Sequence, residues 1–229
     1  MARAWVNLGA ALLAATSGSA IAAPPAPVQG KLATFKVGTV ALAMPIPEGF
    51  CQPIGAQVAA IDLMSQADTA NVTALALTSC AGGASGTAAG AALNFFLVKA
   101  TKALIDTPVT RDEMLKSMAA AFQTAEFKRE MAAGEADAEK AMEAKSGQKI
   151  EMVGEVGPRG TDDVCAYLGG SPEMKGPAGT VRVSMGVCLT VVGSRLITLV
   201  VARPDKDGSA VPALMARARS LAETIRPAS

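Results

Sequence analysis

The sequence predicts an α+β fold: an antiparallel sheet with a long central helix and a C-terminal amphipathic helix packed against it. Several short segments alternate apolar and polar residues, which is typical of strands that bury one face. A helix-start motif stands near residue 110, and an apolar stripe with helical spacing runs through residues 211–225. Strands grouped apart from the helices favour a single α+β domain, which we place at residues 34–229.

Strand-like alternation marks seven segments of this domain. Gly193-Ser194 separates the last two and predicts a two-residue hairpin turn, with glycine first as a type II′ turn prefers. A short helix is predicted over residues 55–67, between the first two strands. The predicted strands are residues 34–44, 72–79, 93–104, 150–156, 162–169, 180–192 and 195–202.

Two further helices are predicted from start signals. Thr110 and Glu113 have the spacing of a capping box, and the helical pattern that follows continues to about residue 146, with Gly134 as the expected break. Residues 126–146 carry charges of both signs and few large apolar groups, which indicates a solvated helix or, alternatively, a helix that docks a partner. The last helix is predicted to begin with Ser209 as its cap.

The N-terminus has the three parts of a secretory signal peptide. Residues 1–23 contain a basic Arg3, an apolar stretch and small residues that end in Ala20-x-Ala22. The apolar stretch is too short to span a bilayer, and a buried N-terminal helix is the alternative interpretation. Residues 24–33 then form a proline-rich leader. We therefore expect a periplasmic or secreted protein of the bacterial envelope type, with no membrane span in the mature chain.

An exported chain with an even number of cysteines predicts disulfides. In a hairpin register that places Cys165 opposite Cys188, both apolar strand faces lie on the same side and Tyr167 covers Gly186. This favours Cys165–Cys188, and Cys51–Cys80 follows by elimination. A redox pair or a thiolate metal site is the alternative, but no Cys-x-x-Cys motif is present.

Composition excludes several function classes. The chain of 229 residues contains no histidine, so a Ser–His–Asp or Cys–His nucleophile and a histidine-based zinc site are excluded. The formal net charge is +1, without the basic surface that nucleic-acid binding requires. We therefore expect no enzymatic activity, no nucleic-acid partner, no cofactor and no metal.

Three weaker motifs have both structural and functional interpretations. Asp162-Asp163 could bind a cation or act in acid–base catalysis, but at the start of a strand it is more typical of a solvated turn. Asp205-Lys-Asp207-Gly208 lacks the first acidic ligand and the distal glutamate of a calcium loop, which favours a turn. Residues 81–92, rich in glycine and alanine, predict a flexible loop and lack the lysine of a phosphate-binding loop.

The order of predicted elements resembles the Mog1/PsbP-like fold family over residues 34–226. The resemblance rests on Pro47-Glu-Gly-Phe50 and on the strand, tight turn, strand and closing helix of residues 183–227. It implies a binding or assembly role, because members include extrinsic photosystem subunits, a nuclear GTPase-binding factor and bacterial envelope proteins. The charged helix, the glycine-rich loop and the cysteines depart from the family, so no family binding residue is carried over.

These observations lead to two functional hypotheses. The first is a non-enzymatic envelope protein that binds or helps to assemble a macromolecular partner, a protein or another envelope component. The alternative is a periplasmic carrier of a small apolar ligand, held between the sheet and the long helix. Phe95, Phe96 and Phe122 are the expected ligand or partner surface.

Overall fold

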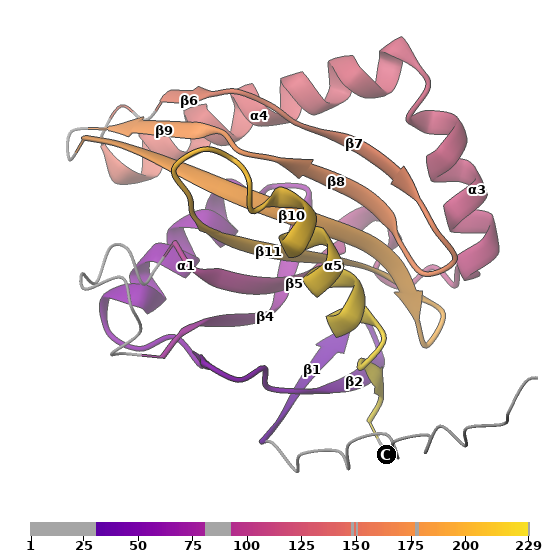
Figure 1. Cartoon of the computed structure of the whole chain (residues 1–229). Helices are drawn as coiled ribbons and strands as arrows, with labels where there is room; N and C mark the ends of the chain where they lie inside the picture. Colours follow the sequence, from indigo (N-terminus) through magenta and orange to yellow (C-terminus); the bar gives the residue numbers. More distant parts are fainter. Residues whose placement is uncertain (1–30, 81–92, 148, 150, 177–178, 229) are drawn as a thin grey trace, which may run out of the picture.

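The structure is a computed structural model that describes residues 31–80, 93–147, 149, 151–176 and 179–228. Within these ranges the chain forms twelve strands, four α-helices and one 3-10 helix. The predicted α+β fold with a long central helix is wrong, because the molecule is mostly antiparallel sheet (Figure 1). The predicted signal peptide, most of the leader and the loop at 81–92 lie outside the described residues.

One nine-stranded sheet forms the centre of the molecule. Its main path runs β3-β4-β5-β11-β10-β8-β7, and every pair along it is antiparallel. The short strands β6 and β9 extend it beside the first half of β10. The bounds are β3 Phe50–Cys51, β4 Asn71–Ser79, β5 Phe95–Thr101, β6 Glu151–Val153, β7 Val156–Thr161, β8 Ala166–Gly170, β9 Glu173–Gly176, β10 Gly179–Val192 and β11 Arg195–Pro204.

A second, three-stranded sheet is formed by the two ends of the described chain. The segment predicted as one strand at 34–44 is a hairpin, β1 (Leu32–Val37) and β2 (Val40–Pro45), because Gly38 adopts a positive φ of 56° and reverses the chain. The C-terminal strand β12 (Arg226–Pro227) pairs with β2.

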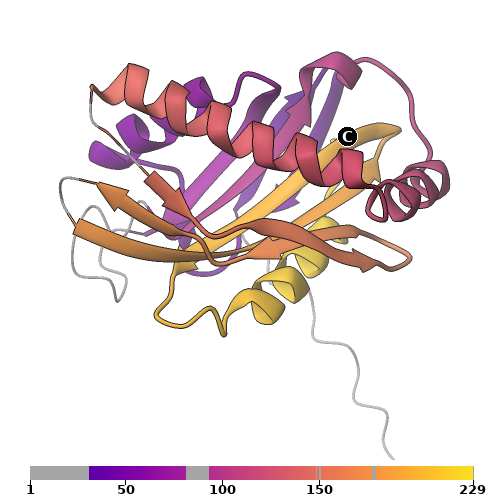
Figure 2. The same ribbon diagram turned by 90° about the horizontal axis from the view of Figure 1, so that it is seen from above.

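The predicted long helix is interrupted, which is one reason for the wrong fold class. Helix α3 (Arg111–Ala121) ends at Phe122, and α4 (Ala125–Ser146) begins after Thr124, whose Oγ1 accepts a hydrogen bond from Phe127 N at 3.1 Å. A capping threonine starts a new helix in a new direction. The expected break at Gly134 lies inside α4 instead, and α3 and α4 lie along the outside of the sheet (Figure 2).

The capping box at Thr110 is present, since Thr110 Oγ1 accepts from Glu113 N and donates to Glu113 Oε2 at 2.6 Å. Ser209, in contrast, does not cap α5 (Val211–Ala222). The N-cap is Ala210, whose N–H donates to Asp205 Oδ2 at 2.9 Å. A carboxylate from the preceding turn therefore accepts a hydrogen bond from a backbone N–H group at the start of this helix.

Both faces of the large sheet are covered. Helix α5 and the β1–β2 hairpin pack on one face, whereas α1 (Ala56–Ala67), α3 and α4 pack on the other. Figure 2 shows this order from above, with α4 and α5 on opposite sides of the strands. The first face is the larger buried cluster, which includes Phe96, Leu199 and Cys188. None of the helices in the described part of the chain is long and apolar enough to cross a membrane.

Candidate functional site

Both disulfides of the predicted pairing are present, Cys51–Cys80 and Cys165–Cys188. The predicted hairpin register, however, is wrong by two residues. Cys188 lies opposite Tyr167, and Gly186 lies opposite Gly169. A shift of two residues keeps every side chain on its original face of the sheet, so the cysteine pairing survives the error.

Gly186 is covered by α5 and not by Tyr167. A Cβ atom at position 186 would lie 2.4 Å from Met215 N, so the helix backbone rests directly on the strand. The turn after β10 also differs from the prediction. Gly193 and Ser194 have φ angles of 56° and 61°, and two positive angles are the signature of a type I′ turn.

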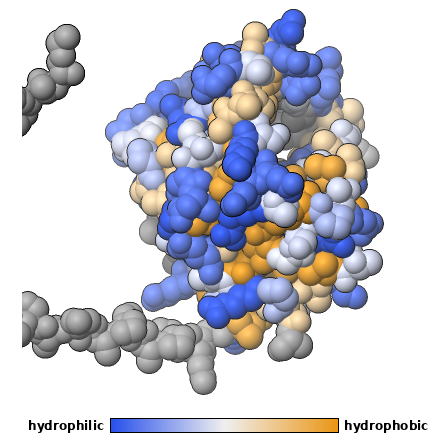
Figure 3. All heavy atoms as spheres, turned by 90° about the vertical axis from the view of Figure 1, so that its right-hand side faces the viewer, coloured by the Kyte–Doolittle hydropathy of each residue, from blue (hydrophilic) through white to orange (hydrophobic). Residues whose placement is uncertain are grey.

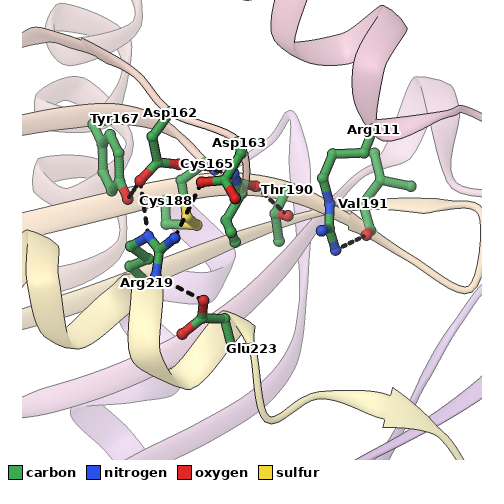
Figure 4. Close-up of a disulfide and its surroundings, with 11 residues drawn as sticks. Arg111, Asp162, Asp163, Cys165, Tyr167, Cys188, Thr190, Val191, Arg219 and Glu223 are labelled. Carbon is green, nitrogen blue, oxygen red and sulfur yellow. Dashed lines mark hydrogen bonds and ion pairs between the residues drawn. A yellow bond between two sulfur atoms is a disulfide. The ribbon is translucent and has the colours of Figure 1, made fainter.

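Asp162 joins the β7–β8 turn to α5 (Figure 4). Its Oδ1 accepts hydrogen bonds from Val164 N at 2.8 Å and Cys165 N at 2.7 Å. Its Oδ2 accepts from Tyr167 Oη at 2.6 Å and from Arg219 Nε at 2.8 Å. A carboxylate offers about four acceptor positions, and all are used here.

The same contacts set the charge of this cluster. Partial burial alone raises the pKa of Asp162, but the hydrogen bonds from Tyr167, the two backbone N–H groups and Arg219 together lower it to about 2. Arg219 also pairs with Asp163, whose side chain is 84% exposed, and with Glu223. Asp162 thus has no free position for a cation, and the acidic pair predicted as a candidate site anchors α5 to the sheet.

The second acidic motif has a similar structural role. Asp205 Oδ2 accepts from Ala210 N and from Ser184 Oγ at 2.8 Å. These hydrogen bonds, with smaller contributions from backbone N–H groups of the same turn, lower its pKa to about 2. Asp207 accepts from Ser209 N in the same turn. No group of three or more potential metal ligands occurs in the described ranges.

The three phenylalanines predicted as a ligand or partner surface are not brought together. Phe95 and Phe96 are neighbours on β5 and point to opposite faces, into different buried clusters. Phe122 lies in a third cluster, where its ring meets that of Phe127 edge-on at 5.1 Å. All three are buried, so they fill the core between sheet and helices.

A groove of about 510 Å³ lies between α1 and β4. We call it the α1–β4 groove. Val58 of α1 is 41% exposed and Val72 of β4 is 39% exposed, and both line it. Ile54, 63% exposed, is the neighbour of the lining residue Pro53. The full lining is Pro53, Val58, Ile61, Asp62, Ser65, Asn71, Val72, Thr73, Ala74, Leu75, Ala76 and Lys102.

The β4 side of this groove is a strand edge. β3 pairs only with Ser79 and Thr78, and no other strand of the described chain pairs with the β4 edge opposite β5. Six consecutive β4 residues, 71–76, line the groove, which indicates that the strand backbone itself contributes to it. The ladder with β5 shifts register between Thr73 and Leu75, so this edge carries a bulge.

Exposed apolar surface also occurs elsewhere. The face in Figure 3, on the α3 side of the molecule, has apolar side chains gathered in its lower half. The large apolar side chains with the highest exposure in the described ranges are Leu32, Ile54, Val58, Val72, Leu104 and Val153. Two of them, Val58 and Val72, line the α1–β4 groove, which distinguishes this groove from scattered exposed side chains.

No pattern in the sequence points directly to the α1–β4 groove. The apolar pattern predicts a short helix over residues 55–67 and a strand over residues 72–79, but it gives that strand no position in the sheet. An edge strand is defined by which strands pair, and that depends on residues far apart in the chain. Comparison with known proteins adds no family: no family description, curated protein or solved structure matches this chain.

Proposed function

We propose that this protein is exported from the cytoplasm and binds a polypeptide partner of the cell envelope, which lies in extended conformation in the α1–β4 groove. The observation that carries the proposal is the combination of an unpaired β4 edge with exposed Val58 and Val72 beside it. Two disulfides are compatible with an oxidising compartment. The resemblance to Mog1/PsbP-like proteins, which act mainly in binding and assembly, supports a binding role.

An extended polypeptide fits this groove for two physical reasons. A strand edge offers a row of backbone donors and acceptors that only another extended backbone matches along its length. Alternate side chains of such a partner would point toward α1, where Val58 and Ile61 supply apolar contacts.

Site-specific photo-crosslinking tests the binding site. A photoreactive residue at position 72 of the mature, oxidised protein should crosslink one defined protein in an envelope fraction. Position 153 on β6 is the matched control, because Val153 is 41% exposed and does not line the groove. Val58→Asp should abolish the adduct and weaken binding of the purified partner by on the order of tenfold or more in calorimetry. Equal crosslinking from both positions, or binding that Val58→Asp leaves unchanged, rules out this groove.

Export is tested separately by fractionation and N-terminal sequencing. We expect mature protein outside the cytoplasm that begins near residue 24, with no thiol that reacts before reduction. A cytosolic product that retains Met1 and has alkylatable cysteines contradicts the compartment in the proposal.

A further inference from the structure

The two disulfides differ in accessibility. Cys165 and Cys188 are both 0% exposed and belong to the main buried cluster. Cys51 is exposed, and Cys80 is half-buried. A thiolate must reach a sulfur atom along the S–S axis to exchange with a disulfide, so only Cys51–Cys80 is open to attack in the folded protein.

Cys51 also lines a second groove, of about 720 Å³, which shares no lining residue with the α1–β4 groove. We call it the β3 groove. Apolar Leu32 and Ile46 lie on it, together with Pro47 and Phe50. The Phe50 ring is held beneath the Arg217 guanidinium, 4.8 Å from the ring centroid. Cys51 is therefore an exposed residue in a groove that can hold an attacking molecule in place.

Opening the Cys51–Cys80 bond is a local event. Strand β3 has two residues and pairs with β4 through those two alone. The adjoining end of β4 keeps a separate support, because Gln57 accepts from Thr78 Oγ1 at 3.0 Å and donates to Ser79 O at 3.2 Å. Opening Cys165–Cys188 instead places two thiols in the packed interior.

We propose that Cys51–Cys80 is a thiol–disulfide exchange site for a thiolate bound in the β3 groove. The incoming thiolate attacks Sγ of Cys51, a mixed disulfide forms, and Cys80 leaves as a thiolate that takes a proton from water. A second thiol from the same reductant attacks the mixed disulfide at the incoming sulfur and releases Cys51. The net reaction oxidises two thiols to a disulfide and reduces Cys51–Cys80 to two thiols.

Graded reduction of the oxidised, full-length protein tests this site. Samples equilibrated with increasing reduced glutathione are blocked with N-ethylmaleimide and mapped by peptide mass spectrometry. We expect label at Cys51 and Cys80 while Cys165 and Cys188 remain unlabelled and the circular dichroism spectrum is unchanged. With oxidised glutathione, the Cys80→Ser variant should form its adduct at Cys51 on the order of tenfold faster than the matched Cys51→Ser variant forms one at Cys80.

Simultaneous labelling of all four cysteines, or labelling that requires loss of the folded spectrum, overturns the proposal, as does equal adduct formation by the two variants. A second experiment distinguishes polypeptide thiols from small thiols as the source of the thiolate. A short apolar peptide with one cysteine that reacts faster than glutathione assigns the site to polypeptide thiols, and the reverse order assigns it to small thiols. Neither arm depends on Val58 or Val72, so failure here leaves the α1–β4 groove untouched.

Discussion

The contact of α5 with β10 gives a stability prediction with a calculable size. Gly186→Ala adds one Cβ atom, which would lie 2.4 Å from Met215 N and 2.5 Å from Leu214 C. Ordinary contact begins at 3.4 Å, so α5 must retreat by about 1 Å. Both obstructing atoms belong to the helix backbone, and no side-chain rotation relieves the clash.

A retreat of α5 loosens the interior that it covers, because Leu214, Ala218 and Ala222 are nearly or fully buried on the sheet. Overpacking of this kind costs about 1–3 kcal/mol, and we expect the upper end because the helix moves as a unit. At about 2–4 °C per kcal/mol for a chain of this size, Tm should fall by about 6–12 °C.

Thermal and urea unfolding, followed by circular dichroism, measure this change. The matched control is Gly176→Ala, because a Cβ atom there meets nothing within 4 Å. That control should unfold within about 0.5 kcal/mol of the wild type. If Gly186→Ala unfolds together with Gly176→Ala, the direct contact between the helix backbone and β10 does not exist in solution.

Two further predictions concern polar contacts. Since the folded pKa of Asp162 is about 2 and its ordinary value is 3.8, the stabilisation by the ionised carboxylate is complete above about pH 4 and is lost as the pH falls toward 2. Urea midpoints measured across this range should therefore fall more steeply for the wild type than for Asp162→Asn, and parallel slopes contradict the assignment. Thr110→Ala removes the cap of α3 and should lower the free energy of unfolding by about 1 kcal/mol. Ser209→Ala should change it by less than about 0.5 kcal/mol, and urea denaturation of both variants measures this difference.

Features that depend on one short segment of the chain can be predicted from the sequence. The Thr110 capping box, the short helix at α1 and the positions of most strands follow from residues close together in the chain. The position of the break between α3 and α4 is a local feature that was predicted wrongly. The sequence pattern predicts a break at Gly134, but the helix breaks at Thr124, because the threonine hydroxyl caps a new helix while a single glycine is tolerated inside one.

Long-range features were not accessible from the sequence. The β8–β10 register pairs Gly186 with Gly169 while α5 lies against Gly186, and the start of α5 is held by Asp205 in place of Ser209. Phe95 and Phe96 were predicted to form part of one ligand or partner surface. Side chains of adjacent strand residues point to opposite faces of the sheet, so these two rings lie in different buried clusters. The candidate grooves arise from edges and exposed side chains, which a pattern of apolar residues does not reveal.

The pairing of β5 with β11 joins the two halves of the chain at the centre of the sheet, with Lys99 opposite Thr198. Both disulfides are local by comparison, with sequence separations of 29 and 23 residues. Oxidation can therefore crosslink each half of the chain without bringing the two halves together. The pairing of β5 with β11 must still close the long loop between them. Pairing between strands so far apart in the sequence is slow. Until β5 and β11 have paired, each exposes a strand edge with which another chain can pair.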